Sequence, residues 1–387
     1  MRRKSSAAWR KPSRPSRRRS EATSASLRMR GSGLPATLCR FTIARQEEPP
    51  MNCLLRSLLC AGTFIAAGQA ASAQSSYTGM GDASAAEPLG NGHFIVADDE
   101  SDVLRIYKRD TAAPVASVDL TDVLRNRKPS GKAVEADIEG AAMVGERIYW
   151  ISSHARKGKS GDADPNRHRL FATDIDRSGP VPTVKPVGQV HEALLQELLQ
   201  DPRFDVLKTA SERKPEDKDG LNIEGLASTP EGGLLIGFRN PLPKGRALVV
   251  LLLNPQQVID GGARPQFGEL IRLDLGQRGI RSIERAGHDY LIAAGPFATA
   301  SQSKARPAFA LYRWSGKPGA KPEKLQSLDN GSFRAEALFF DADTRDIVLL
   351  SDDGDEQVGP VDCKDKSVPA DRKSFRSWVL PWPAAHP

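Results

Sequence analysis

A short motif recurs five times along this chain and constrains its fold more than any other feature. Each copy places one oxygen-bearing side chain at the same position among small or apolar residues, and a β-rich run follows. The copies are Asp82-Ala-Ser84-Ala-Ala, Asp137-Ile-Glu139-Gly-Ala, Asn222-Ile-Glu224-Gly-Leu, Arg281-Ser282-Ile and Arg334-Ala-Glu336-Ala-Leu. The shared position therefore holds Ser84, Glu139, Glu224, Ser282 and Glu336. Repeats at this spacing are typical of folds in which each copy forms one structural unit.

The segments after each motif read as short strands, rich in Val, Ile, Leu, Tyr and Phe and bounded by Gly, Pro, Asp or Asn. About four strands per repeat predict an all-β fold, a five-bladed β-propeller, with a six-bladed propeller containing one poorly marked blade as the alternative. The last repeat is one strand short, and residues 75–81 precede the first motif. We therefore expect an N-terminal strand to complete the final blade and remove its open edge.

One interval between motifs is longer than the others. Glu139 and Glu224 are 85 residues apart, whereas the other intervals are 54–58 residues long. The spacing of apolar residues predicts a helix at His191–Leu199, and a charged run follows at Ser211–Asp219. We interpret this region as a short helical insertion between blades.

The N-terminal region is predicted to lie outside the propeller. Residues 1–50 are rich in Arg, Ser and Pro and cannot bury a core, so we expect them to be disordered and to be an over-extended gene start. Residues 51–73 have the basic start, apolar middle and Ala-Ser-Ala end of a signal peptide. The alternative is a basic arm ahead of an internal membrane anchor. Residues 74–387 would then form a single exported domain, periplasmic or secreted.

Removal of residues 1–73 reverses the sign of the net charge. The full chain carries +7, but 41 of its 55 Lys and Arg and 45 of its 48 Asp and Glu lie after residue 73, which leaves about −4. This argues against nucleic acid as a partner, and no membrane contact is expected after signal removal. Three of the four cysteines precede residue 74, so Cys363 has no partner for an internal disulfide. We expect a monomer.

The shared positions predict a metal site on the propeller axis. Three carboxylates and two hydroxyls that converge there would repel each other unless each acid is protonated or bound to a cation. Oxygen donors without Cys or His favour calcium over zinc or copper. In the alternative interpretation, the acids line a wet channel and pair with Arg281, Arg334 or other basic neighbours. The predicted metal ligands are Ser84, Glu139, Glu224, Ser282 and Glu336.

The loops that follow the second strand of each blade are polar and are predicted to surround the channel mouth. We assign Asp98, Asp99 and His154 as candidate catalytic residues, because acids beside a metal, or a histidine, can activate water. The candidate substrate-binding residues combine cations with opposing acids and would hold a phosphate or carboxylate. They are Arg156, Lys157, Arg239, Asn240, Asp352 and Asp353. These side chains could equally be solvated loop charges, and the paired aspartates could be turn formers.

The sequence also resembles two known families. Segments 137–159, 166–175, 220–255, 279–296 and 351–355 resemble a bacterial domain-of-unknown-function family, number 3616, over nearly the whole region after residue 73. The chain also resembles, more remotely, the calcium-activated nucleotidases, secreted apyrases with a five-bladed propeller. In these, one residue per blade binds an axial calcium in the order Ser, Glu, Glu, Ser, Glu, which the five shared positions reproduce. Their paired-aspartate segment matches Asp98-Asp99, and their other substrate-binding residues find no match here.

Two classes of function remain open on these grounds. The first is a propeller that binds an anionic, phosphate-bearing small molecule, a protein or a glycan around a structural calcium. The second, suggested by the ring of oxygen ligands and the basic loop residues, is a nucleotidase-like, calcium-dependent hydrolase of phosphoanhydrides or phosphoesters.

Overall fold

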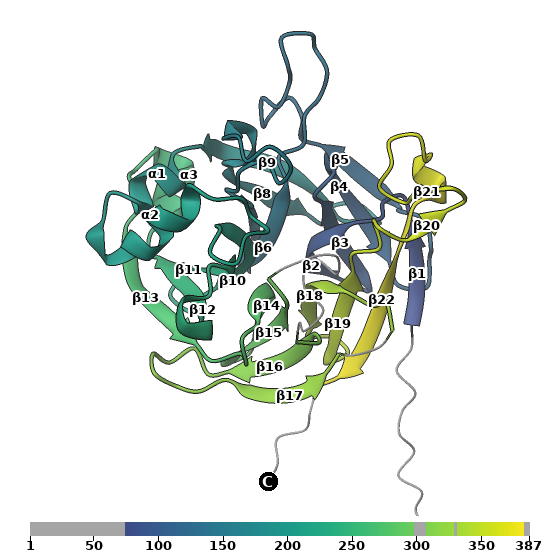
Figure 1. Ribbon diagram of the computed structural model, residues 1–387. Coiled ribbons are helices and arrows are strands. Elements are labelled where there is room, and N and C mark those ends of the chain that lie inside the picture. The colour runs from purple at the N-terminus through teal and green to yellow at the C-terminus, as the bar shows by residue number, and fades with distance from the viewer. Residues whose placement is uncertain (1–73, 298–306, 329–330, 383–387) are drawn as a thin grey trace, which may run out of the picture. The chain divides into compact units, whose positions relative to one another are not determined.

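Five antiparallel four-stranded sheets make up this computed structural model, which describes residues 74–297, 307–328 and 331–382 (Figure 1). Blade 1 contains β2 (Ala83–Gly90), β3 (His93–Asp98), β4 (Ser101–Lys108) and β5 (Ala116–Asp119). Blade 2 contains β6 (Ile138–Val144), β7 (Arg147–Ser152), β8 (Leu170–Asp176) and β9 (Thr183–His191). Blade 3 contains β10 (Asn222–Ser228), β11 (Leu234–Asn240), β12 (Ala247–Leu252) and β13 (Phe267–Leu273). Blade 4 contains β14 (Gly279–Ala286), β15 (Asp289–Gly295), β16 (Ala310–Trp314) and β17 (Glu323–Ser327).

Blade 5 is completed by the N-terminal strand, as the sequence predicted. Its strands are β18 (Ala335–Asp341), β19 (Asp346–Ser351), β22 (Ser374–Pro381) and β1 (Gln74–Thr78). β1 pairs antiparallel with β22, with Gln74 opposite Trp378 and Thr78 opposite Ser374. The ring of Tyr77 stacks on Phe375 at 5.3 Å and meets the ring of Phe94 edge-on at 5.2 Å. Backbone pairing and aromatic packing thus join the two ends of the domain.

The first strand of each blade lies innermost and contacts the first strand of the next. These contacts run from β2 to β6, β10, β14 and β18 and return from β18 to β2. The five sheets therefore surround one axis, as Figure 1 shows. The five-bladed prediction is confirmed for the described residues, and its six-bladed alternative is wrong.

Five hydrophobic clusters fill the five interfaces between neighbouring blades. Each sheet buries both faces, so many strands are continuous apolar runs, such as ALVVLL in β12. Trp150 contributes to the cluster between blades 1 and 2, and Trp314 to the cluster between blades 3 and 4, and both are fully buried. The inner strands are therefore held rigidly around the axis.

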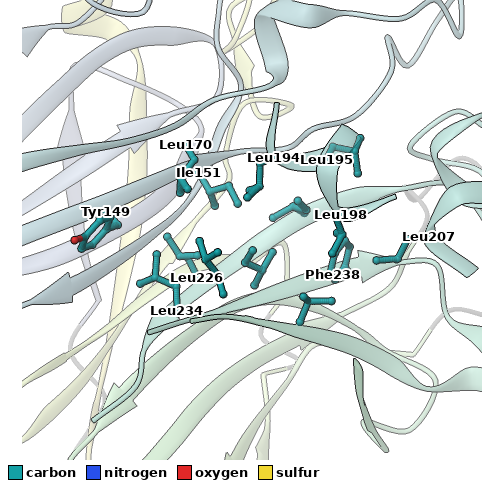
Figure 2. Close-up of a cluster of buried hydrophobic side chains, with 14 of the residues drawn as sticks. Tyr149, Ile151, Leu170, Leu194, Leu195, Leu198, Leu207, Leu226, Leu234 and Phe238 are labelled. Carbon is teal, nitrogen blue, oxygen red and sulfur yellow. The ribbon is translucent and has the colours of Figure 1, made fainter. Parts of the chain in front are cut away.

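The predicted insertion is present, but its helix is shorter than expected. β9 continues to His191, and α1 spans only Leu194–Leu198, followed by the 3₁₀ turn Pro202–Phe204 and α2 (Asp205–Ser211). Figure 2 shows Leu194, Leu198 and Leu207 beside Leu226 and Phe238 of blade 3, with which they share one buried cluster. The insertion therefore covers the interface between blades 2 and 3.

Several smaller elements were not predicted. α3 (Pro255–Gly261) begins with a proline and is capped by Gly262, whose φ of 63° is left-handed. Both are helix-end signals that could have revealed the helix. A hairpin of β20 (Gln357–Val358) and β21 (Val361–Asp362) and 3₁₀ turns complete the fold. These turns span Pro165–Arg167, Pro243–Gly245 and Ala370–Arg372. The predicted disordered segment 1–50 and signal peptide 51–73 lie outside the described residues. Within the described ranges, every helix is too short or too polar to span a membrane.

Candidate functional site

Each inner strand carries a β-bulge where its repeat motif lies. The register against the second strand of the blade skips one residue in every case, and a bulge leaves such a residue unpaired and redirects its side chain. The skipped residues are Ser84, Glu139, Glu224, Arg281 and Glu336. All five line one pocket of about 90 Å³. The bulge is thus the device that turns each repeat toward a common cavity.

The fourth repeat is therefore displaced by one residue from the sequence alignment. Arg281 occupies the bulge, whereas Ser282 pairs with Ala293 and its Oγ accepts a hydrogen bond from the Leu338 backbone N–H at 3.2 Å. Ser282 does not line the pocket. Alignment of the motifs matched Ser282 with Ser84 because both are serines. The strand register, which the alignment does not show, decides which side chain faces the pocket. A guanidinium stands where a hydroxyl was expected.

Glycine follows the bulged residue in two repeats because the next blade lies against it. A Cβ on Gly140 would come within 3.0 Å of Leu226 in blade 3, and one on Gly225 within 2.9 Å of Ile280 and Ile283 in blade 4. The Glu-Gly pair thus combines a side chain directed at the pocket with close packing between blades.

The pocket is strongly acidic. Six carboxyl groups line it, opposed by the two guanidinium groups of Arg239 and Arg281. The acids are Asp82, Asp99, Glu139, Glu224, Glu336 and Asp352. Such a density of carboxyl groups in one small cavity requires protons, arginines or a cation to balance it.

Arginines balance the side of the pocket formed by blades 3 to 5, which we call the arginine half: Glu224, Glu336, Arg239 and Arg281. Glu224 Oε1 lies 2.8 Å from Arg239 Nη1, and its Oε2 lies 3.0 Å from Arg281 Nε. Arg281 also pairs with Glu336 through two nitrogens. Burial raises the pKa of Glu224 and brings that of Glu336 to about 7, while the guanidinium groups oppose the rise. These pairings match the alternative interpretation of the sequence for two of its three glutamates.

No such pairing occurs among the acids of blades 1 and 2, which we call the acid half: Asp82, Asp99 and Glu139. None of the three forms an ion pair with a described residue, and Asp99 Oδ1 is buried without a described hydrogen-bond partner. Burial and the adjacent Asp352 raise the pKa of Asp82 to about 9. Burial and neighbouring carboxylates also raise the pKa values of Asp99 and Glu139 well above their ordinary range.

Asp99 is the residue that connects the carboxylates around the acid half. Its carboxylate belongs to two groups in which the ligand atoms lie within 4.8 Å of one another. One group joins it to Asp82 and Asp98, and the other to Asp137 and Glu139. Arg167 pairs with Asp137 at 2.9 Å, and Arg105 lies 3.5 Å from Asp98. Asp82, Asp99 and Glu139 are therefore the members of these groups without a cationic partner in the described structure.

Ser84 lines the pocket, but its hydroxyl already has backbone partners. Oγ donates to the carbonyl oxygen of Ile138 at 2.5 Å and lies 3.3 Å from that of Ala97. It thus connects blade 1 to blade 2, and an oxygen lone pair remains for a ligand.

Two of the three candidate catalytic residues lie outside the pocket lining. Asp98 is buried and accepts hydrogen bonds from Glu100 N at 3.0 Å and Ser101 Oγ at 3.2 Å, the turn-forming role considered from sequence. His154 is buried against the ring of His168 at 5.3 Å, and its Nδ1 lies 2.8 Å from the carbonyl oxygen of Ser152. Only Asp99 of this set reaches the pocket. Their catalytic roles stay predictions.

Of the six candidate substrate-binding residues, two line the pocket and four do not. Arg239 and Asp352 line the pocket. Asn240 is fully buried and donates to the carbonyl oxygens of Pro215 and Asp217, and Asp353 pairs with Arg376 at 2.6 Å. Arg156 donates to the Gly161 carbonyl oxygen of its own loop, and Lys157 lines a different cavity.

The sequence did not identify Asp82, Asp137 or Arg167 as site residues, and it offered Arg281 only in the alternative interpretation, as a basic partner of the acids. Asp82 and Asp137 stand two positions before the bulged residue in their motifs, a repeated signal that could have identified them. The place of Arg281 in the pocket follows from the register of the bulge, which the sequence does not show. Arg167 comes from a loop that has no counterpart in the other repeats.

Comparison with known proteins assigns no activity to this chain. No curated protein matches the chain. Solved structures that are similar include glutaminyl cyclase of Myxococcus xanthus, with 11% identity over 79% of this chain and 94% of that one, and a TM-score of 0.39. A putative oxidoreductase (glucose dehydrogenase) of Thermus thermophilus shows 13% identity over 80% and 100%, with a TM-score of 0.40. Aldose sugar dehydrogenase of Streptomyces coelicolor shows 13% identity over 80% and 99%, with a TM-score of 0.37. At these TM-scores and identities the likeness carries no inference about fold or function.

A family model agrees with the first of the two resemblances found in the sequence. It matches residues 82–178 and 183–342, which include all five bulged residues of the pocket and most of the five blades. The resemblance to calcium-activated nucleotidases stays a prediction. The chain belongs to the family described as Protein of unknown function (DUF3616).

Proposed function

We propose that this propeller binds a divalent cation, with calcium as the best fit, in the acid half of the channel pocket. The observation that carries the proposal is the state of Asp99, whose buried Oδ1 has no described hydrogen-bond partner although it lies among other acids. Asp82, Asp99 and Glu139 would hold the ion, and Ser84 and Asp352 line the same pocket. The predicted axial site is thereby moved off the axis, because Arg281 neutralises Glu224 and Glu336.

The donor chemistry supports calcium. Calcium takes six to eight oxygen ligands in flexible geometry, from carboxylates, hydroxyls, carbonyls and water. Carboxylates dominate the acid half, and His and Cys are absent from the residues that line the pocket, which disfavours zinc and copper. A cavity of about 90 Å³ has room for an ion with bound water. The ion would supply positive charge that holds an anionic group at the channel mouth.

The test is a calcium titration of protein first stripped with a chelator. We expect calcium to raise the melting temperature of the parent protein, since a ligand at 100 times its Kd stabilises by about 2.7 kcal/mol. Asp99→Asn should abolish this rise. Asp122→Asn, which changes an aspartate whose side chain is 83% exposed, should leave it intact. A parent protein that shows neither calorimetric binding nor a melting shift with calcium contradicts the proposal.

We assign a binding role, with an anionic phosphate-bearing molecule as the ligand; a protein or glycan ligand is the alternative. A calcium-dependent hydrolase is the second candidate, favoured by the one pocket-lining catalytic candidate, Asp99, beside the proposed ion. Incubation with nucleoside diphosphates, phytate and aryl phosphates, with calcium or chelator, separates the two. Phosphate release that needs both calcium and Asp99 supports the hydrolase, and its absence leaves the binder.

We also propose that the propeller acts outside the cytoplasm, after cleavage that follows Ala73. Support comes from the signal-peptide pattern of residues 51–73. Expression in a bacterium, fractionation and N-terminal sequencing test this. A periplasmic protein that begins at Gln74 is the expected result, and an uncleaved cytoplasmic chain contradicts it.

A further inference from the structure

A second cavity, of about 400 Å³, has more basic than acidic side chains in its lining. It lies between the loop that joins β5 to β6 and the loop that joins β7 to β8, with one residue from the segment after β21. We call it the basic cavity. Five cationic residues line it against two acids, Glu135 and Asp164. The cations are Arg127, Lys128, Lys132, Lys157 and Lys366.

The two acids of the basic cavity already have partners. Arg167 Nη2 lies 3.5 Å from Glu135 Oε1, and Arg167 Nε lies 3.9 Å from Asp164 Oδ2. Asp164 also accepts hydrogen bonds from the backbone and side chain of Asn166 at 3.3 and 3.0 Å. Arg127 is also paired, with Asp122 at 2.7 Å, so the positive charge without a close counter-charge comes from the lysines.

Three lysines of the cavity have no acidic partner in the described structure. Lys128, Lys132 and Lys366 are exposed and form no ion pair with a described residue, and Lys157 Nζ lies 4.0 Å from Asp164. Ammonium groups that share a concave surface without counter-charges raise the local concentration of anions. The cavity thus suits a ligand with several negative charges.

The loop that carries two of these lysines is held by its own backbone. Lys128 N donates to Lys132 O at 2.9 Å, Gly131 N to Lys128 O at 2.8 Å, and Val134 N to Asn126 O at 2.9 Å. A hairpin of this kind places both side chains on one short turn. Less backbone freedom is then lost when a ligand binds.

One arginine connects the basic cavity to the channel pocket. Arg167, which contacts both acids of the cavity, also pairs with Asp137 through Nη1 at 2.9 Å. Asp137 has a carboxylate oxygen within 4.8 Å of those of Asp99 and Glu139. The basic cavity and the acid half are therefore neighbours across a single guanidinium.

The geometry points to the basic cavity as the binding site of a phosphoanhydride group, with the phosphate nearer the channel directed toward the cation proposed in the acid half. The inference deepens the proposed function and rests on it for the second contact only. Lysines hold phosphate as point charges, and a divalent cation commonly bridges an adjacent phosphate. A single carboxylate would contact either the lysines or the cation, whereas a diphosphate would contact both.

The test uses inorganic pyrophosphate as the probe and calorimetry as the readout, first in chelator and then with calcium. The variant is the double Lys128→Ala and Lys132→Ala, and the matched control is Lys317→Ala and Lys321→Ala, two exposed lysines between β16 and β17. We expect parent and control to bind pyrophosphate, more tightly with calcium than in chelator. The Lys128/Lys132 variant should bind about tenfold more weakly and still bind calcium as the parent does.

Each outcome decides one part of the inference. Equal pyrophosphate affinity in the Lys128/Lys132 variant and the parent overturns it, and so does an equal loss in the control pair, which would indicate a general charge effect. Pyrophosphate binding that depends on the two lysines but ignores calcium overturns the bridging contact and retains the cavity. Failure of calcium to bind at all rejects the proposed function while the chelator titration still tests the lysines.

Discussion

The two halves of the channel pocket begin from the same bulged motif and reach opposite electrostatic solutions. In the arginine half, Glu224 and Glu336 share Arg281, and Glu224 also contacts Arg239. In the acid half, Asp99 and Glu139 are surrounded by further acids, and burial with this repulsion raises both pKa values. One half is therefore complete as it stands, and the other needs protons or a cation.

This contrast shows that repeated positions do not imply repeated roles. The bulge directs five side chains at one cavity, but the identity of the fourth, Arg281, determines which glutamates are neutralised. An ion that needed all five residues would meet a guanidinium. An ion in the acid half would meet three carboxylates, none of which forms an ion pair with a described residue.

The largest expected effect is the loss of Arg281. Arg281→Ala leaves two buried carboxylates short of a partner, which costs about 3–5 kcal/mol of unfolding free energy when a buried pair is broken. Urea denaturation measures it. Arg313→Ala, which breaks an exposed pair with Glu323, should cost about 0–1 kcal/mol and is the control. Equal losses in both variants would erase the distinction between the halves.

Neutralising one glutamate in each half should change the free energy of unfolding in opposite directions when calcium is removed by a chelator. Glu224→Gln removes the partner of two arginines and should destabilise by about 3 kcal/mol. Glu139→Gln removes an acid that has no described ion-pair partner and should stabilise by about 1 kcal/mol. Both are measured by denaturant unfolding without calcium. If both variants lose stability alike, the acid half is balanced by something other than protons or a cation.

The dependence of stability on acid pH tests His154, a buried histidine outside the pocket lining. Burial, with the nearby His168, lowers the pKa of His154 to about 3. The unfolded chain then binds a proton that the folded chain refuses, so stability is lost as pH falls from 6.5 toward 3. The loss due to His154 should be about 2 kcal/mol between pH 7 and pH 5. His154→Asn should remove that part of the pH dependence, and an unchanged profile would contradict a buried neutral ring.

The smallest expected effect is that of Ser282→Ala. Its Oγ accepts one hydrogen bond from Leu338 N outside the pocket, so about 1 kcal/mol or less should be lost. Calcium affinity should stay as in the parent. Loss of calcium binding comparable to that of Asp99→Asn would instead restore the ring as predicted from sequence.

Much of the fold could be predicted because its signals are local. Four strands follow each of the first four motifs, as the apolar runs predict, and the spare segment before the first motif pairs in blade 5. The helix at His191–Leu199 was shortened because pairing carries β9 to His191, where Leu170 lies opposite it. Tertiary hydrogen bonding overrode helix propensity at that boundary.

The site was predictable to the level of the repeat and no further. Glu139, Glu224 and Glu336 line the pocket as expected, since an unpaired residue at equivalent strand positions faces the same axis. Asp98, His154 and Asn240 do not line the pocket, because hydrogen bonds to other groups hold their side chains: Asp98 accepts from Glu100 N, His154 Nδ1 lies beside Ser152 O, and Asn240 donates to Pro215 O. Loop hydrogen bonds of this kind leave no periodic trace in a sequence.

The order of residues alone determined five repeats, their strands, the closing strand and the acidic character of the channel, because each depends on spacing and polarity along the chain. Only the folded structure decided that Arg281 faces the pocket, that it takes two glutamates, and that Asp99 remains among acids. The physical reason is that ion pairs form between residues far apart in the sequence. In addition, a shift of one residue in the register of a bulge changes which side chain faces the pocket.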